Sequence, residues 1–445
     1  MSAIEPMSAI GRGGSTAPTS PSFPDATRVF TKIGLLSFGG PTAQIALMHR
    51  ILVEEKGWLS EDQFLGALSF CMLLPGPEAM QLATYTGWRL HGVKGGLAAG
   101  LLFVLPGALL VFALAAIYAG FGEVPVVQAI FLGVKSAVLI IVVEALFRIA
   151  KRALKLPAHW ILATASFVAI FFLSLPFPLV VAAAAAVGFG LSWFQAETDE
   201  TGPMPETKIG LGQTLTTVGL WLFIWFAPLV AITIAFGRDH VLTQLGVFFS
   251  KLAVVTFGGA YAVLSYMAQD VVQHHGWLGA GEMMDGLGLA ETTNGPLILV
   301  TEFVGYLAGH RFGAGIPMLM GTAGAAVALW ATFVPCFMWI FAGAPYIDRL
   351  QRTPCLRGAL AGVTAAVVGV ILNLTVWFGL HVFFGTVTSI SAGPLTLWLP
   401  ELSTINWPAV VLAVVAALAL LRFHAGVAWT LVLVGSLALG WHLVV

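Results

Sequence analysis

The sequence predicts an all-α polytopic membrane protein, built from two homologous halves in inverted topology with broken or re-entrant helices. Three observations lead to this: a very low charge, a series of apolar segments of about 20 residues, and a set of motifs that occurs twice. Hydrophobic residues make up 58% of the chain and charged residues 9%, against roughly 25% charged in soluble domains. The bilayer is therefore the expected solvent for much of the chain.

The repeat is clearest around two Phe-Gly-Gly sequences. Residues 30–41 are FTKIGLLSFGGP and residues 249–260 are FSKLAVVTFGGA, an offset of 219 (258 − 39). Two further motif pairs follow at the same offset without a gap: Gly57-Trp58-Leu59 with Gly276-Trp277-Leu278, and Gly76-Pro77 with Gly295-Pro296. Two copies of one unit in an apolar chain are typical of secondary transporters, which hold their substrate where the copies meet.

We expect four parts along the chain: a disordered tail over 1–27, a first repeat over 28–194, a polar cytoplasmic linker over 195–212 and a second repeat over 213–445. The tail is rich in Ser, Pro and Gly and lacks the charged start and apolar core of a signal peptide. Membrane-spanning helices are predicted over the long apolar runs, at 95–119, 127–147, 159–175, 178–194, 214–236, 316–342, 358–384, 408–421 and 426–443.

Basic residues gather in short loops at 89–94, 148–155 and 349–357. By the positive-inside rule these loops face the cytoplasm, and so does the N-terminus. The basic loop follows span 127–147 in the first copy, whereas it precedes span 358–384 in the second. This reversal is what an inverted repeat requires.

The segments 28–90 and 247–312 are less regular, because Gly-Gly and Pro-Gly-Pro interrupt their apolar stretches. Such breaks persist at membrane depth when they are buried in protein or line a cavity. A helix that restarts there aims unpaired N–H groups and its positive dipole end at an anion. A plain kink is the alternative, and the duplication disfavours it. The expected substrate-binding residues at the breaks are Ser37, Phe38, Gly39, Gly40, Pro41, Pro75, Gly76, Pro77, Thr256, Gly258, Gly259, Asn294, Gly295 and Pro296.

Lys32 and Lys251 are the charged residues that both copies share at this offset. As point charges related by an inverted axis they would flank one central dianion, and we include both among the substrate-binding candidates. The alternative is that each side chain snorkels to the lipid headgroups.

Acidic residues near the breaks are candidates for coupling to protons. Glu78 directly follows a break, where a positive helix end favours its ionised form; a simple capping role is the alternative. Glu291 and Glu302 flank the second break of the second copy, at expected membrane depth. Arg50, in an amphipathic segment, would gather anions at an entrance or belong to a solvated helix face.

Other function classes lack their signals in this sequence. The net charge of −1 offers no basic field for nucleic acid. Cys71, Cys336 and Cys355 show neither CxxC nor a zinc-binding spacing with His, and we expect no metal or other cofactor. The metalloprotease motif HExxH and the hydrolase motif GxSxG are also missing, so an intramembrane enzyme is the less favoured hypothesis.

With these residues in view, the chain resembles the chromate ion transporter family in its long, two-domain form. The resemblance covers nearly the whole chain beyond the tail. It is most specific in one ordered series of motifs: Phe38-Gly39-Gly40-Pro41, Gly57-Trp58-Leu59, Pro75-Gly76-Pro77 and Phe103-Val104-Leu105-Pro106. The resemblance implies a secondary active transporter that exports chromate, a tetrahedral dianion, across the bacterial inner membrane and confers chromate resistance.

The chain departs from the family pattern at two positions. Met72 stands where many relatives have Gln, and Asn294 replaces the first proline of the second Pro-Gly-Pro. Sulfate or another oxyanion therefore stays open as the substrate, and an anion channel stays open as the mode of transport. The expected partners are the oxyanion and the lipid bilayer; a homodimer is also open.

Overall fold

The computed structural model describes residues 21–195, 211–255, 257, 260–347, 353–393 and 395–444. The first copy contains α1 (Phe23–Leu36), α2 (Gly40–His49), the π-helix η1 (Arg50–Glu55), α3 (Glu61–Leu73), α4 (Glu78–Phe121), α5 (Pro125–Ala153), α6 (Pro157–Phe171) and α7 (Phe177–Gln195). The rest of the chain contains α8 (Leu211–Phe236), α9 (Val241–Val255), α10 (Ala260–Gln269), the π-helix η3 (Asp270–His274), α11 (Ala280–Thr292), the 3-10 turn η4 (Leu297–Leu299), α12 (Val300–Phe312), α13 (Pro317–Gly343), the 3-10 turn η5 (Ala344–Tyr346), α15 (Pro354–Phe383), the 3-10 turn η6 (Leu402–Thr404), α16 (Trp407–Ala417), the π-helix η7 (Leu418–Arg422) and α17 (Val427–Val444).

Helices extend into the ends of the predicted tail (1–27) and linker (195–212): α1 begins at Phe23, α7 ends at Gln195 and α8 begins at Leu211. Most of the tail (1–20) and most of the linker (196–210) lie outside the described residues. Helix α1 begins at Phe23, inside the predicted tail, because the Ser22 side chain accepts a hydrogen bond from the backbone N–H of Asp25 and Pro24 occupies the first turn. Both features favour a helix start.

The two copies fold alike, element by element. Helix α3 covers 61–73 and α11 covers 280–292, so both ends match at the offset of 219. The same offset brings α1, α2 and η1 onto α9, α10 and η3 within one or two residues. Helix α8 has no counterpart among the described first-copy helices, and one extra crossing before the second copy is what an inverted repeat requires.

Helix α4 consists of two antiparallel helices rather than one long rod. His91 and Gly92 have non-helical backbone angles, with φ +62° at Gly92. The chain folds back there, so closely that a Cβ on Gly87 would overlap the carbonyl oxygen of Gly95. In the second copy, α12 and α13 pair in the same way, with Gly305 against Gly324. Small residues permit this close helix packing in membranes.

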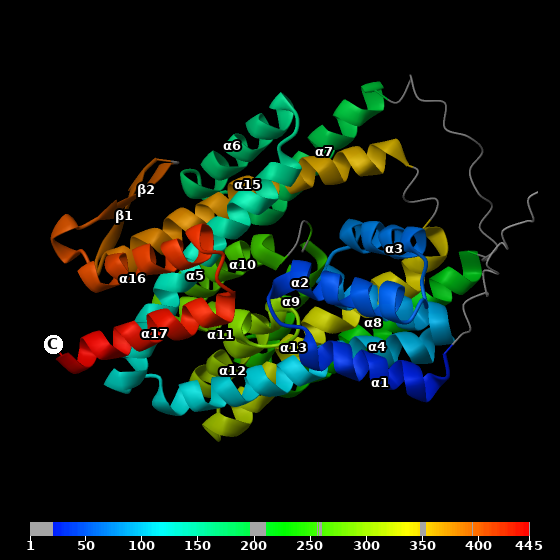
Figure 1. The fold of residues 1–445 in the computed structure, drawn as a ribbon, viewed down its shortest axis with the longest axis horizontal. Helices are drawn as coiled ribbons and strands as arrows, with labels where there is room; N and C mark the ends of the chain where they lie inside the picture. The colour runs from blue at the N-terminus through cyan, green and yellow to red at the C-terminus, as the bar shows by residue number, and fades with distance from the viewer. Residues whose placement is uncertain are drawn as a thin grey trace, which may run out of the picture.

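The last helices of each copy pack against helices of the other copy (Figure 1). Helix α15 of the second copy packs against α6 and α7 of the first, while α5 of the first copy packs against α16 and α17 of the second. Six helices of the described chain are long and apolar enough to cross a membrane, which makes this a multi-pass membrane protein. The nine predicted spans overlap the second part of α4 and α5, α6, α7, α8, α13, α15, α16 and α17. Six of these are the long helices, whereas α6, α7 and α16 are shorter, and span 159–175 runs past the end of α6 at Phe171.

One element departs from the all-helical expectation. An antiparallel hairpin, β1 (Val387–Ala392) and β2 (Leu395–Pro400), joins α15 to α16, with Ile390 opposite Leu397. Leu395, Leu397 and Leu399 share one exposed face of β2. Their period of two is a strand signal, which a search for helix-length apolar runs overlooks.

Candidate functional site

The break after α1 meets a break from the other copy. The backbone N–H of Gly295 donates to the carbonyl oxygen of Ser37 at 2.9 Å. Gln44 Nε2 donates to the Gly295 carbonyl at 2.6 Å, and Asn294 Nδ2 donates to the Gly34 carbonyl at 3.3 Å. Two of the predicted breaks are therefore joined to each other between the two copies. The residues that join them, Ser37, Gln44, Asn294 and Gly295, are buried, whereas Phe38 and Gly39 of the same break are exposed.

The turn between α1 and α2 depends on two glycines. Gly39 and Gly40 have φ of +87° and +76°, a region that residues with a side chain rarely adopt. Helix α2 restarts at Gly40 with Pro41 in its first turn, and no side chain caps it. The first N–H groups of α2 have no partner within the helix and are available to an anion.

The second break of the first copy is packed tightly against the second copy. Gly76 has φ +122°, and a Cβ there would lie 2.9 Å from Cys336 Sγ of α13. Gln81 Nε2 donates to the Pro75 carbonyl at 2.7 Å and holds the turn in place. Helix α4 then begins at Glu78, whose N-cap, Pro77, offers no side-chain hydrogen bond.

A cavity of about 160 Å³ lies where these helix starts converge. At about 30 Å³ per water, it has room for about five waters or for a tetrahedral oxyanion. Its lining comes from α2, α3, α4, α5, α10 and α15, and so from both copies. The lining residues are Pro41, Thr42, Met72, Glu78, Arg148, Ile149, Arg152, Ala260, Tyr261 and Thr364.

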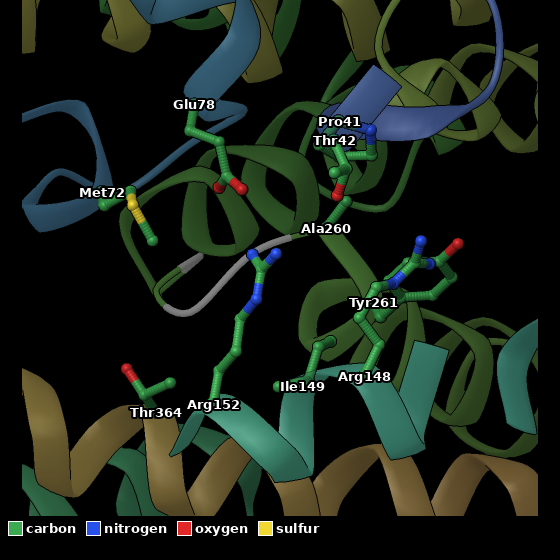
Figure 2. Close-up of a pocket in the computed structure, with 10 residues that line it drawn as sticks. All are labelled: Pro41, Thr42, Met72, Glu78, Arg148, Ile149, Arg152, Ala260, Tyr261 and Thr364. Atoms are coloured by element: carbon green, nitrogen blue, oxygen red, sulfur yellow. The ribbon is translucent and has the colours of Figure 1, made fainter. Parts of the chain in front are cut away.

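Two arginines from the last turns of α5 give the cavity its positive charge. Figure 2 shows the Arg152 guanidinium pointing into the cavity toward the Glu78 carboxylate, with Arg148 beside Tyr261. Arg148 Nη1 lies 3.9 Å from Glu144 Oε1. Arg152 forms no ion pair with any carboxylate of the described residues, so its positive charge is available to a ligand.

A buried carboxylate lies directly behind the cavity wall. Tyr261 Oη donates to Glu291 Oε1 of α11 at 2.7 Å, and Glu291 is 8% exposed. The positive charge of Arg148 acts on the same carboxylate. The cavity thus combines two guanidinium groups, the starts of three helices and one carboxylate, with a second carboxylate behind its wall. Such a set of groups can bind an anion and respond to a proton.

The structure places the predicted residues in three groups. Pro41 and Glu78 line the cavity, and Glu291 contacts it through Tyr261. The remaining break residues that the structure describes lie outside the cavity lining: Ser37, Phe38, Gly39, Gly40, Pro75, Gly76, Pro77, Asn294, Gly295 and Pro296. Thr256, Gly258 and Gly259 lie outside the described residues.

Four predicted charged residues lie away from the cavity lining. Lys32 and Lys251 are exposed on α1 and α9, and Lys251 Nζ lies 5.7 Å from the centre of the Tyr266 ring. Exposure of this kind accords with snorkelling; a shared dianion site for the two lysines stays a prediction. Arg50 is exposed, and its Nε lies 3.5 Å from Glu55 Oε1. Glu302 is 2% exposed, and its Oε2 has no hydrogen-bond partner in the described chain.

Arg148 and Arg152 are the site residues that the sequence analysis overlooks. From the sequence they mark only the cytoplasmic end of a span predicted to end at 147. Helix α5 continues to Ala153 and carries both side chains to the cavity. The available signal is their spacing, because residues four apart share one face of a helix.

Comparison with known proteins matches this sequence to one family. The family model described as chromate transporter matches residues 25–189 and 243–441. The chain is 33% identical to the chromate transport protein of Pseudomonas aeruginosa over 371 residues, covering 81% of this chain and 82% of that protein. It is 32% identical to the chromate transport protein of Cupriavidus metallidurans over 358 residues (78% and 80%) and 31% identical to a probable chromate transport protein of Synechococcus elongatus over 385 residues (84% and 91%). No solved structure matches the chain.

Proposed function

This chain belongs to the chromate transporter family, and we propose that it is a secondary active transporter that exports chromate across a bacterial inner membrane. Export would lower the internal chromate concentration and confer resistance. The N-terminus and the basic end of α5 lie in the cytoplasm in this proposal. The observation that carries the proposal is the cavity between the copies, where Arg148 and Arg152 meet the starts of α2, α4 and α10.

The chemistry of this cavity suits a tetrahedral dianion. A guanidinium group offers parallel N–H donors that match two oxygens of an oxyanion. The starts of α2 and α4 add backbone N–H donors without side-chain caps. Chromate and sulfate share this shape and charge, so the cavity accounts for the class of substrate; the preference for chromate follows from the named relatives.

Glu78 supplies a route for coupling to protons. Its carboxylate faces Arg152 across the cavity (Figure 2), so in its ionised form it competes with the dianion for the same guanidinium. A proton on Glu78 removes that competition, and one proton then accompanies one dianion. The complex would carry one net negative charge outward, which a membrane potential negative inside favours by about 2.3 kcal/mol per 100 mV.

Purified protein in liposomes would test this proposal. Radiolabelled chromate outside, with chromate or sulfate trapped inside, should enter by counterflow and accumulate transiently above equilibrium. An imposed membrane potential should drive net accumulation. Equilibration without accumulation would indicate a channel, and no chromate uptake with either internal anion would overturn the proposal. If labelled sulfate enters by counterflow and labelled chromate does not, sulfate is the substrate.

A further inference from the structure

A second charged cluster lies between the two copies, away from the cavity, with its carboxylate buried and its lysine side chain 24% exposed. Lys135 Nζ of α5 lies 3.3 Å from Asp285 Oδ2 of α11. Tyr118 Oη of α4 donates to the same oxygen at 2.7 Å. Asp285 is 3% exposed, and its other oxygen, Oδ1, has no partner in the described chain. The first copy thus supplies the lysine and the tyrosine, and the second supplies the carboxylate.

This cluster lies at membrane depth. Helix α5 covers 125–153, so its midpoint is near residue 139, and Lys135 lies about 6 Å from that midpoint at 1.5 Å per residue. Arg148 lies about 20 Å further along the same helix. Charged groups at this depth are costly to bury, and those that occur there usually serve a function.

The other charged groups near Asp285 are paired elsewhere. Glu282, one turn earlier on α11, accepts a hydrogen bond at 2.8 Å from Arg311 Nη1 of α12. Helices α15 and α17 also pack against α11, but they add no charged group to the described contacts of Asp285. Lys135 is therefore the cation that compensates Asp285, and the two charges depend on each other.

We infer that Asp285 is a proton-binding residue, and that its ion pair with Lys135 holds α11 against α4 and α5 until a proton releases it. This inference rests on the proposed transport function and adds a second coupling group to it. The proton passes from water to a carboxylate oxygen of Asp285, which becomes neutral. Lys135, whose side chain is 24% exposed, is then a largely covered charge without a partner, an unfavourable state, so the protonated protein adopts an arrangement in which Lys135 reaches water more fully.

Helix α11 connects this event to the anion site. Glu291 follows Asp285 by six residues, about 9 Å along the helix, and it accepts the hydrogen bond of Tyr261, which lines the cavity. A movement of α11 that breaks the Lys135 pair therefore also moves a residue in contact with the cavity wall. Proton binding near the middle of α11 and anion binding near its C-terminal end are coupled through one helix.

Distance measurements between two spin labels would test the inference without any anion present. The labels are placed on Val126→Cys at the start of α5 and on Gly279→Cys before α11, with the three native cysteines replaced by alanine. We expect the distance distribution to change between pH 8.5 and pH 5.5. With Asp285→Asn it should be the same at both pH values, whereas the exposed control Asp239→Asn should keep the pH response.

Asp285→Asn leaves Lys135 as a largely covered charge without a partner, so a double variant keeps the test valid if that single variant fails to fold. Lys135→Gln with Asp285→Asn removes both charges and should fold, with a distribution that does not depend on pH. A full pH response in Asp285→Asn or in the double variant would overturn the inference, as would a wild-type distribution that pH does not change. Chromate binding is measured on the same samples. A wild-type protein that does not bind chromate would refute the proposed function and leave the inference about Asp285 standing.

Discussion

Replacing Arg152 with glutamine removes the cation of the cavity that has no carboxylate partner in the described chain. Its guanidinium points into the cavity from the last turn of α5 (Figure 2). Glutamine keeps a polar side chain that can still donate one hydrogen bond, but it carries no charge. We therefore expect weaker binding of chromate and sulfate alike, because the lost interaction depends on charge and not on the identity of the central atom.

The expected size of the effect follows from the contact that is lost. A hydrogen bond to a charged group contributes about 1.5–3 kcal/mol. At about 1.4 kcal/mol per tenfold change, the dissociation constant should rise about 10- to 150-fold. Arg152→Lys keeps the charge but loses the paired donors of the guanidinium, so its affinity should lie between those of wild type and Arg152→Gln.

Isothermal titration of the detergent-solubilised protein with chromate, at one fixed low ionic strength, measures this change. Salt must be fixed because it screens charges of partly exposed groups. Lys155→Gln is the matched control: it removes one positive charge near the same end of α5, from an exposed residue outside the cavity lining. Arg152→Gln with the wild-type melting temperature and an affinity within about twofold of wild type would refute the assignment of the cavity.

Three further predictions concern other parts of the site. Gly76→Leu should abolish transport while the protein still inserts, because φ is +122° and Gln81 and Cys336 already fill the space; normal counterflow by the inserted variant would contradict this. Lys32→Gln and Lys251→Gln should each weaken chromate binding about tenfold or more if the lysines share one dianion, and unchanged titrations for both would leave snorkelling as their role. The pKa of His49 should lie above 6.5, because Glu61 accepts a hydrogen bond from its ring at 2.7 Å and Glu54 adds negative charge. The pair then stabilises the fold below about pH 6.5 and ceases to do so as the pH rises through the raised pKa; carbon-13 NMR of labelled histidine should show this pKa falling in Glu61→Gln, and no change would contradict the assignment.

The sequence by itself determined the architecture at the level of helices and copies. Apolar run length fixes where a chain can cross the bilayer, because unpaired backbone groups are excluded from lipid. That constraint is local, so spans such as 127–147 and 214–236 lie within α5 and α8. The offset of 219 likewise fixes α3 and α11 in corresponding places, since equal motifs at equal spacing fold into equal units.

The contacts that give the site its chemistry were decided only by the tertiary structure. Ser37 accepts a hydrogen bond from Gly295, and Lys135 pairs with Asp285. The partners are far apart in the sequence, so no local sequence pattern predicts these contacts. In the sequence, Arg152 is one of several basic residues at a helix end. Only the packing of α5 against the second copy places its side chain in the cavity. Helix period and hydrophobicity act over a few residues, whereas the partner of a buried charge depends on how whole helices cross. The same difference explains why a basic loop could indicate orientation and yet conceal two anion-binding candidates.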